Sequence, residues 1–271
     1  MKVRVIAGAV LVIVLLLLVL VAPKWLAAVI FGLLLAIEAY ELLYVTGLVR
    51  HPRLVLYSAV MAAGIALWSF FGAVHAFLVL AVLLFFVLLF AEMMADHIKV
   101  RLEMITMCML AGLVIPYLLT ALIRILTLKI GKYLILIPFV VAYANDAGAY
   151  FFGLMFGKHK LAPVVSPNKT IEGLLGGILC GTLGMLLYAL LLQFAFHFRV
   201  NYVYALIYGL LGSALGVVGD LSFSVIKRQT GIKDYGNLIP GHGGVLDRFD
   251  SLVTVAPLIE VLLILIPVAV G

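Results

Sequence analysis

Charged residues are scarce in this sequence: Asp, Glu, Lys and Arg make up only 11% of the 271 residues, whereas 66% are hydrophobic. So little charge cannot cover the surface of a water-soluble domain, and the mean hydropathy is +1.31. Continuous apolar runs of about 20 residues, the length that crosses the hydrocarbon core of a bilayer, recur along the chain. Their continuity argues against a transmembrane β-barrel, whose strands alternate. The sequence therefore predicts an all-α, polytopic integral membrane protein.

Cysteine and the common catalytic motifs are also sparse or missing. The two cysteines, Cys108 and Cys180, fall inside apolar runs and suggest small core residues rather than a disulfide framework. The sequence contains no Walker A motif, no Ser-His-Asp pattern and no C-x-x-C pair. Four histidines show no spacing typical of metal ligands: His51, His75, His159 and His197.

Nine apolar segments are expected to span the membrane. They cover residues 5–21, 25–45, 54–71, 74–91, 104–123, 133–152, 171–196, 202–226 and 251–270. The first follows Lys2 and Arg4 as a signal peptide would, but it is longer than a typical h-region and lacks a small-x-small cleavage site. We therefore expect a retained span. Residues 1–103 would form a membrane scaffold of four spans, and residues 104–271 a catalytic region of five.

Positive charge sets the expected orientation. With a cytoplasmic N-terminus, the inner segments carry 13 of the 18 Lys and Arg residues and the outer segments carry 5. This bias follows the positive-inside rule, and it explains the net charge of +6 without a nucleic-acid partner. Both polar loops, 153–170 and 227–250, would then face the cytoplasm, where nucleotides are available.

The densest mixture of acids and bases lies in residues 220–250. Carboxylates that can hold a metal ion stand there beside bases that can hold phosphate, a combination that suits phosphoryl or nucleotidyl transfer. Asp220, Ser224 and Lys227 are spaced to share one helix face near the cytoplasmic boundary. They present a carboxylate, a hydroxyl and an ammonium to one cavity or, alternatively, Asp220 and Lys227 form an internal ion pair.

A glycine-rich loop follows, from Pro240 to Gly244, and its exposed amides could cradle an anion. Asp247 and Asp250 come next at a spacing compatible with one helix face and a metal ion. Arg248 between them either pairs with phosphate or anchors the helix at the membrane interface.

Two upstream segments are expected to contribute to the same site. Asn145 and Asp146 stand late in the sixth expected span, where a carboxylate among aromatic residues needs a cationic partner or a metal. Residues 166–173 read S-P-N-K-T-I-E-G, and Lys169 is their best phosphate candidate. In that segment Thr170 is an N-cap and Pro167 a turn residue, or else the segment contacts substrate directly.

Other positions have plainer interpretations. Glycines repeated every three or four residues are expected to allow close helix contact, with room for substrate beside Gly219 as a further option. They are Gly173, Gly177, Gly181, Gly209, Gly212, Gly216 and Gly219. Several charges near the cytoplasmic boundary are expected to be solvated or paired scaffold groups, with the lining of an entrance as the less favoured alternative. They are Glu38, Glu41, Glu92, Asp96 and His97.

The segment 224–250 reads S-V-I-K-R-Q-T-G-I-K-D-Y-G-N-L-I-P-G-H-G-G-V-L-D-R-F-D. It resembles the C-terminal motif of the phosphatidate cytidylyltransferase family, the CDP-diacylglycerol synthases. Asn145-Asp146 and residues 166–170 resemble the upstream elements of that family. The length and the nine-span layout also fit, so the similarity covers essentially the whole chain, with little specific signal in the first four spans. The resemblance implies an all-helical fold and transfer of the cytidylyl group of CTP to phosphatidic acid, with release of pyrophosphate. It also implies Mg²⁺, a supporting K⁺, and a homodimer in the bacterial cytoplasmic (inner) membrane.

The residues and the resemblance together give an expected site. Mg²⁺ would be held by Asp220 and Asp247, with Asp146 or Asp250 in support. The residues expected to act in catalysis are Asp220, Ser224, Lys227, Asp247 and Asp250. Those expected to bind CTP or the lipid headgroup are Asn145, Ser166, Asn168, Lys169, Arg228, Lys233, Asp234, His242, Gly243, Gly244 and Arg248. His242 either binds phosphate or orients Asp247.

Two rival functions remain. A CTP-dependent lipid kinase of the polyprenol type would share the membrane helices, the acids and the nucleotide. An ion-coupled secondary transporter would use membrane acids differently, although the concentration of charge in one loop and the lack of an internal repeat argue against it.

Overall fold

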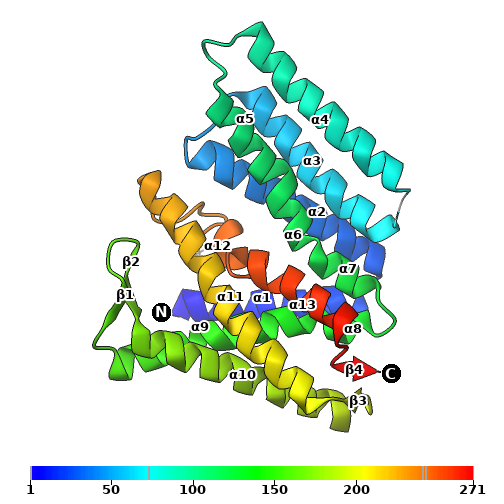
Figure 1. Ribbon diagram of the computed structural model, residues 1–271, viewed down its shortest axis with the longest axis vertical. Coiled ribbons are helices and arrows are strands. Elements are labelled where there is room, and N and C mark those ends of the chain that lie inside the picture. Colours follow the sequence, from blue (N-terminus) through cyan, green and yellow to red (C-terminus); the bar gives the residue numbers. More distant parts are fainter. Residues whose placement is uncertain (1, 73, 240, 242, 271) are drawn as a thin grey trace. The chain divides into compact units, whose positions relative to one another are not determined.

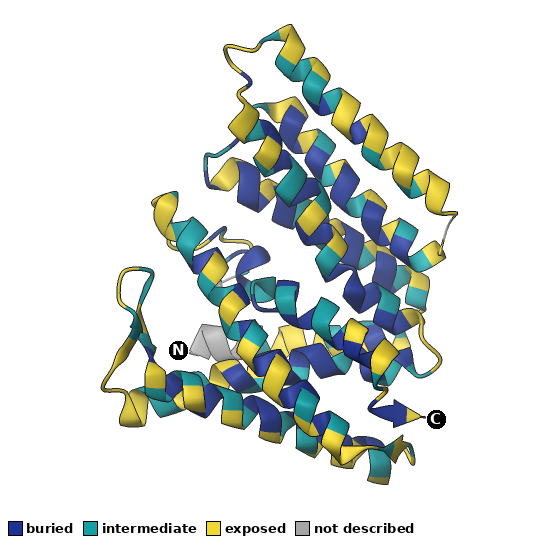
Figure 2. Ribbon diagram, in the orientation of Figure 1, coloured by how far each residue is buried: buried dark blue, intermediate teal, exposed yellow. Residues whose placement is uncertain are grey.

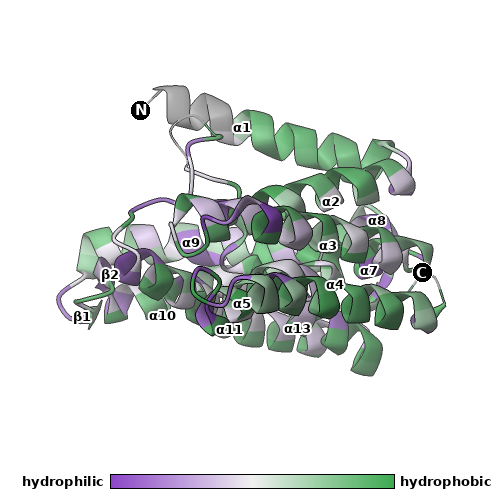
Figure 3. Ribbon diagram, turned by 90° about the horizontal axis from the view of Figure 1, so that it is seen from above, coloured by the Kyte–Doolittle hydropathy of each residue, from purple (hydrophilic) through white to green (hydrophobic). Residues whose placement is uncertain are grey.

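The structure is a computed structural model. It describes residues 2–72, 74–239, 241 and 243–270, with side chains from residue 8 onward. The regular structure is mostly helical, which confirms the predicted fold class (Figure 1). In Figure 3 hydrophobic residues cover most of the helices, and hydrophilic residues concentrate around β2 and in connecting loops.

The helices follow the apolar runs of the sequence. The first half contains α1 (Lys2–Leu16), α2 (Lys24–Tyr40), α3 (Pro52–Phe71), α4 (His75–Ala95), α5 (Leu102–Met109), α6 (Ile115–Leu119) and α7 (Ala121–Thr127). Wider π-type turns extend three of these helical runs: η1 (Leu17–Val21), η2 (Glu41–Val45) and η3 (Leu110–Val114). The second half contains α8 (Gly131–Leu134), α9 (Leu136–Phe156), α10 (Ile171–Phe194), α11 (Tyr202–Gln229), α12 (Leu246–Phe249) and α13 (Leu252–Leu265).

Seven helical stretches within the described residues are long and apolar enough to cross a membrane. They are Lys24–Val45, Pro52–Phe71, His75–Ala95, Leu102–Thr127, Gly131–Phe156, Ile171–Phe194 and Tyr202–Gln229. The first and last expected spans correspond to shorter apolar helices, Gly8–Val21 and Leu252–Leu265. The chain is thus a multi-pass membrane protein, while nine spans and a cytoplasmic N-terminus stay predictions.

The chain divides into two compact units. Unit 1 comprises Met1–Arg124 and Gln229–Phe249, and unit 2 comprises Ile125–Arg228 and Asp250–Gly271. The stretch rich in acids and bases, residues 220–250, is therefore divided between the two units. Residues 229–249 belong to unit 1 with the N-terminal helices, and residues 220–228 and 250 belong to unit 2. The functional division at residues 103 and 104 stays a prediction.

Unit 1 is built on close packing of α2 against α3. Gly32 of α2 faces Ala66 of α3, and a Cβ built on Gly32 would lie 3.4 Å from the Ala66 methyl carbon. Such small residues let helix backbones approach in a membrane, where no hydrophobic force drives helices together. By contrast α4 has only Phe85 and Leu89 buried and is largely exposed along its length (Figure 2).

Unit 2 relies on the glycines of α10 and α11, as predicted. A Cβ on Gly177 would lie 2.7 Å from Asn145 Oδ1, and one on Gly209 would lie 2.6 Å from Thr182 Cα. Gly219 is likewise a packing position, because a Cβ there would meet Thr254 Oγ1 at 2.6 Å. The expectation that Gly219 leaves room for substrate is wrong at this point, since α13 fills that space.

Two small antiparallel sheets in unit 2 were not predicted. β1 (Lys160–Ala162) pairs with β2 (Ser166–Thr170), and β3 (Arg199–Val200) pairs with β4 (Ala269–Val270). The second pairing shortens the expected span 251–270, whose helix ends at Leu265 because β4 follows it. Hydropathy runs carry no signal for strands this short, and β3 and β4 also pair across a long stretch of the sequence.

Candidate active site

A pocket of about 460 Å³, with a largely apolar wall that also carries charged side chains, lies among the helices of unit 2. Its wall includes Asn145 and Asp146 from α9, Asn168 and Lys169 from β2, and Asp220 from α11. These five side chains come from three separate segments, and each was a candidate on sequence grounds. The structure therefore brings the two upstream segments together with the first acid of the charged stretch.

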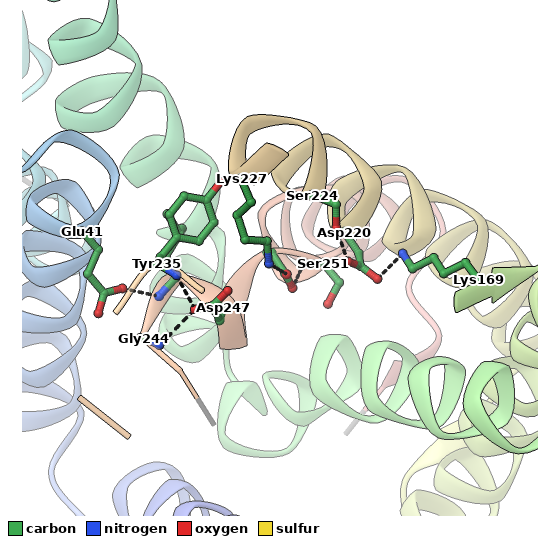
Figure 4. A network of polar contacts seen from close by, with 11 residues as sticks. Glu41, Lys169, Asp220, Ser224, Lys227, Tyr235, Gly244, Asp247 and Ser251 are labelled. Carbon is green, nitrogen blue, oxygen red and sulfur yellow. Dashed lines mark hydrogen bonds and ion pairs between the residues drawn. The ribbon is translucent and has the colours of Figure 1, made fainter. Parts of the chain in front are cut away.

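Asp220 and Lys169 form an ion pair on this wall, through the carboxylate Oδ2 and the ammonium Nζ (Figure 4). Both side chains are 27% exposed, so solvent or a ligand can reach the pair. Ser224, one turn further along α11, donates from Oγ to Asp220 Oδ1 at 3.4 Å. The predicted common face of Asp220 and Ser224 is confirmed, whereas the cation beside Asp220 comes from a segment 51 residues earlier.

Lys169 reaches the pocket because β2 leads directly into α10. Thr170 ends the strand, and its Oγ1 accepts the N–H of Gly173 at 3.0 Å. The N-cap interpretation of Thr170 is therefore confirmed. Pro167 lies inside β2, so the expectation that it forms a turn is wrong.

The β1–β2 hairpin is held at its base and near its tip. Glu172 accepts the backbone N–H groups of Lys158 and His159 at 3.1 and 3.2 Å, and its Oε1 lies 2.6 Å from His159 Nδ1. Near the tip, Arg228 Nε donates to the carbonyl of Val165 at 3.1 Å. Arg228, a predicted substrate ligand, thus positions the segment that carries the pocket lysine.

A second ion pair joins Lys227 to Asp250. The Lys227 Nζ and Asp250 Oδ2 atoms are 3.8 Å apart, and the side chains are only 12% and 13% exposed. Burial raises the pKa of Asp250 to about 7, repulsion from Asp220 and from Asp146 adds to this rise, and Lys227 opposes it. Asp220 and Asp146 are thus close enough to Asp250 to repel its carboxylate, an arrangement that favours a cation.

Asn145 and Ser166 differ in their relation to the pocket. Asn145 is 1% exposed, and its Oδ1 has no hydrogen-bond partner among the described residues. A buried amide oxygen without a partner is costly, and this one is packed against Gly177 of α10, where a Cβ would lie 2.7 Å from it. Ser166 begins β2 but is not part of the pocket wall.

In unit 1 the glycine-rich loop folds around Asp247. This carboxylate is 7% exposed, and its Oδ2 accepts the N–H groups of Tyr235 at 2.7 Å and Gly244 at 3.0 Å (Figure 4). Gly243 has φ of +85°, a backbone conformation that side chains disfavour. The Gly244 amide is therefore bound to protein rather than exposed for an anion, contrary to our expectation. Substrate contacts by Gly243 and Gly244 stay predictions.

The other predicted ligands in this loop are less enclosed. Lys233 and Asp234 are exposed. The Nε atom of Arg248 is buried and has no hydrogen-bond partner within the described part of the chain, so this guanidinium retains capacity for an anion. His242 lies outside the described residues, and its expected role stays a prediction.

The contacts of Glu41 with the loop of residues 229–249 were not predicted from the sequence. This residue begins η2, is 3% exposed, and its Oε1 and Oε2 accept the N–H groups of Val245 at 3.0 Å and Leu246 at 2.8 Å. It is a paired scaffold charge, as one interpretation held, but its partners are amides of the charged loop. The available signal was a carboxylate inside an apolar run, where charge is costly.

The donor set suits a hard cation such as Mg²⁺, although the described residues contain no group of three or more His, Cys, Asp or Glu arranged to hold a metal ion. Mg²⁺ is typically bound by one or two carboxylates, with substrate phosphates and water completing its shell. Asp220 and Asp250 provide two such carboxylates within unit 2. The raised pKa of Asp250 fits, because a cation there would relieve the repulsion.

The fold and the pocket define a polytopic membrane protein with an acid- and lysine-lined site. The profile of the Cytidylyltransferase family matches residues 2–266, and the chain belongs to this family. Similar proteins are the phosphatidate cytidylyltransferases of Staphylococcus aureus (strain COL) and Staphylococcus epidermidis (strain RP62A), 45% and 46% identical over 134 residues. That segment is 49% of this chain and 50% of each relative, so the match spans about half the length of these curated relatives.

Proposed function

We propose that this protein is a phosphatidate cytidylyltransferase, which converts CTP and phosphatidic acid to CDP-diacylglycerol and pyrophosphate. Membership of the Cytidylyltransferase family and the names of the similar staphylococcal proteins support the proposal. The observation that carries it is the pocket of unit 2, where Lys169, Asp220 and Asp146 line one cavity among membrane-spanning helices. A cavity of this kind suits an anionic lipid headgroup and a nucleotide phosphate.

The reaction needs no nucleophile from the protein. An oxygen of the lipid phosphate attacks the α-phosphorus of CTP, and the new P–O bond forms while the bond to the β-phosphate oxygen breaks. Pyrophosphate leaves with that electron pair. Because both reactants are anions, the protein has to position them and offset their repulsion.

Lys169 and Asp220 have complementary tasks in this scheme. Their ion pair holds the lysine at the pocket wall, where its ammonium can turn to an incoming phosphate without leaving the site. Ser224 steadies Asp220 through its hydroxyl, and Lys227 keeps Asp250 close to the same pocket. Arg248, whose Nε has no hydrogen-bond partner among the described residues, is assigned to phosphate binding.

We assign Mg²⁺ to Asp220 and Asp250, with Asp146 in support. When bound, the ion would supply positive charge beside the phosphates and offset the charge that develops on them. Asp247, the expected partner of Asp220 in holding Mg²⁺, uses one oxygen for two backbone amides, and its part in metal binding stays a prediction. A supporting K⁺, a homodimer, and a site facing the cytoplasm of the bacterial cytoplasmic (inner) membrane complete the proposal.

The test is incubation of purified protein with Mg²⁺, phosphatidic acid and CTP labelled at either the α- or the γ-phosphate. We expect the α label in CDP-diacylglycerol and the γ label in pyrophosphate. Transfer of the γ label to lipid would instead make the protein a CTP-dependent lipid kinase. Solute transport in liposomes without CTP turnover would make it a transporter.

A further inference from the structure

The charged loop of unit 1, residues 229–249, is folded around the carboxylate of Glu41, which belongs to a helix distant in sequence. Glu41 accepts the amides of Val245 and Leu246, which are 204 and 205 residues later in the chain. Hydrogen bonds from N–H groups to an ionised carboxylate are stronger than bonds between neutral groups. They also offset part of the cost of burying a charge at the end of a membrane-spanning helix.

The loop backbone closes over this carboxylate at two glycines. A Cβ on Gly244 would lie 2.5 Å from both Oε1 and Oε2 of Glu41, and a Cβ on Gly236 would lie 2.7 Å from Oε1. Neither glycine has a positive φ. Contact with Glu41, rather than a strained backbone, therefore excludes a side chain at these two positions.

Asp247 completes the arrangement from within the loop. Its Oδ2 takes the amides of Tyr235 and Gly244, so the two carboxylates together accept four backbone N–H groups. Three of these amides, at residues 244 to 246, immediately precede Asp247. The direction of the Asp247 and Arg248 side chains thus depends on backbone that Glu41 holds.

We propose that Glu41 is a positioning residue for cytidylyl transfer, which fixes the backbone of residues 244–246 so that Asp247 and Arg248 are correctly placed. This inference rests on the proposed function. It gives the N-terminal scaffold an indirect part in the reaction, since residue 41 belongs to the α2–η2 helix. Glu41 acts through the loop and touches neither substrate.

The test compares Glu41→Gln with Glu38→Gln. Glu38 lies one turn earlier on the same helix and is also 3% exposed, but neither of its carboxyl oxygens has a hydrogen-bond partner among the described residues. It is therefore a matched control for the loss of a buried carboxyl group. In Glu41→Gln an NH₂ group replaces one of the two carboxyl oxygens. It faces a backbone N–H and cannot accept a hydrogen bond from it.

We expect kcat, normalised to folded protein, to fall about 10- to 100-fold in Glu41→Gln, the range found when groups that orient functional residues are lost. Hydrogen exchange should become faster at Val245 and Leu246, while the thermal midpoint should match that of Glu38→Gln. Glu38→Gln should keep the wild-type kcat. Wild-type kcat and exchange in Glu41→Gln would overturn the inference, as would an equal loss of kcat in both variants.

A double-mutant cycle tests the contact itself. Gly236→Ala should lower kcat because its methyl group meets Glu41 Oε1, whereas Gly236→Ala in a Glu41→Ala background should cause little further loss. Additive losses would contradict the proposed contact. If wild-type protein forms no CDP-diacylglycerol, the proposed function fails and this inference fails with it. If wild-type protein is active and Glu41→Gln is unaffected, only this inference fails.

Discussion

The environment of Asp250 predicts an unusual dependence of stability on pH. Its pKa is raised from an ordinary 3.8 to about 7, so the folded protein retains a proton that the unfolded chain releases. Below about pH 4 both states are protonated and the group has no effect. Between about pH 4 and pH 7 folding stability should fall as pH rises, and above pH 7 it should level off. The carboxylate is 13% exposed, so water screens it little.

The size of this change in folding stability follows from the two pKa values of Asp250, in the unfolded and the folded state. At 1.36 kcal/mol per pH unit, the difference between 3.8 and about 7 corresponds to about 4 kcal/mol. For a chain of this size that is roughly 8 °C in the midpoint of thermal unfolding. The assay is the thermal midpoint of detergent-solubilised protein from pH 5 to pH 8, in chelator and at a fixed scan rate.

Asp250→Asn should remove most of this slope, because it has no proton to release. Asp96→Asn is the control: the hydrogen bond and ion pair with Lys99 lower the pKa of Asp96, so this group stays ionised across the range. Mg²⁺ should raise the wild-type midpoint at pH 8 more than that of Asp250→Asn. A wild-type midpoint that is flat with pH in chelator, or an unchanged slope in Asp250→Asn, would refute the reasoning.

Three further predictions concern turnover. Asp220→Asn should reduce CDP-diacylglycerol formation by about 100-fold or more while the folded protein stays in membranes, and near-normal activity would remove Asp220 from the metal site. Lys227→Ala should weaken the use of CTP or lipid, and an unchanged rate and apparent CTP affinity would reduce Lys227 to a scaffold ion pair. Arg228→Ala should free the hairpin at Val165 and lower kcat about 10-fold, with faster protease cleavage of residues 158–166 as the structural readout.

Local patterns in the sequence predicted the helices and the parts of the site that lie on one helix. Continuous hydropathy located the apolar helices, and the four-residue spacing placed Ser224 beside Asp220. The preference of threonine for helix N-termini predicted the cap at Thr170. Each of these inferences needs only the neighbouring residues, because the periodicity of a helix fixes which side chains share a face.

The pairings that depend on folding could not be read in this way. Lys169 pairs with an acid 51 residues later, and Glu41 binds amides more than 200 residues away. No periodicity links such positions. The glycine-rich loop illustrates the consequence: its composition suggested amides open to an anion, but Asp247 accepts the amide of Gly244, and Glu41 accepts the next two amides, those of Val245 and Leu246.

Four acids of the two candidate regions therefore fall into two groups by what compensates their charge. Asp220 and Asp250 face lysine ammonium groups, on long side chains that can turn toward a phosphate while a metal ion takes their place. Glu41 and Asp247 face backbone amides, which cannot move away without unfolding the loop. Exchange of partners during a reaction is feasible only in the first group. Substitution in that group should alter substrate and metal binding, whereas substitution of Glu41 should first alter hydrogen exchange in the loop and, through it, turnover.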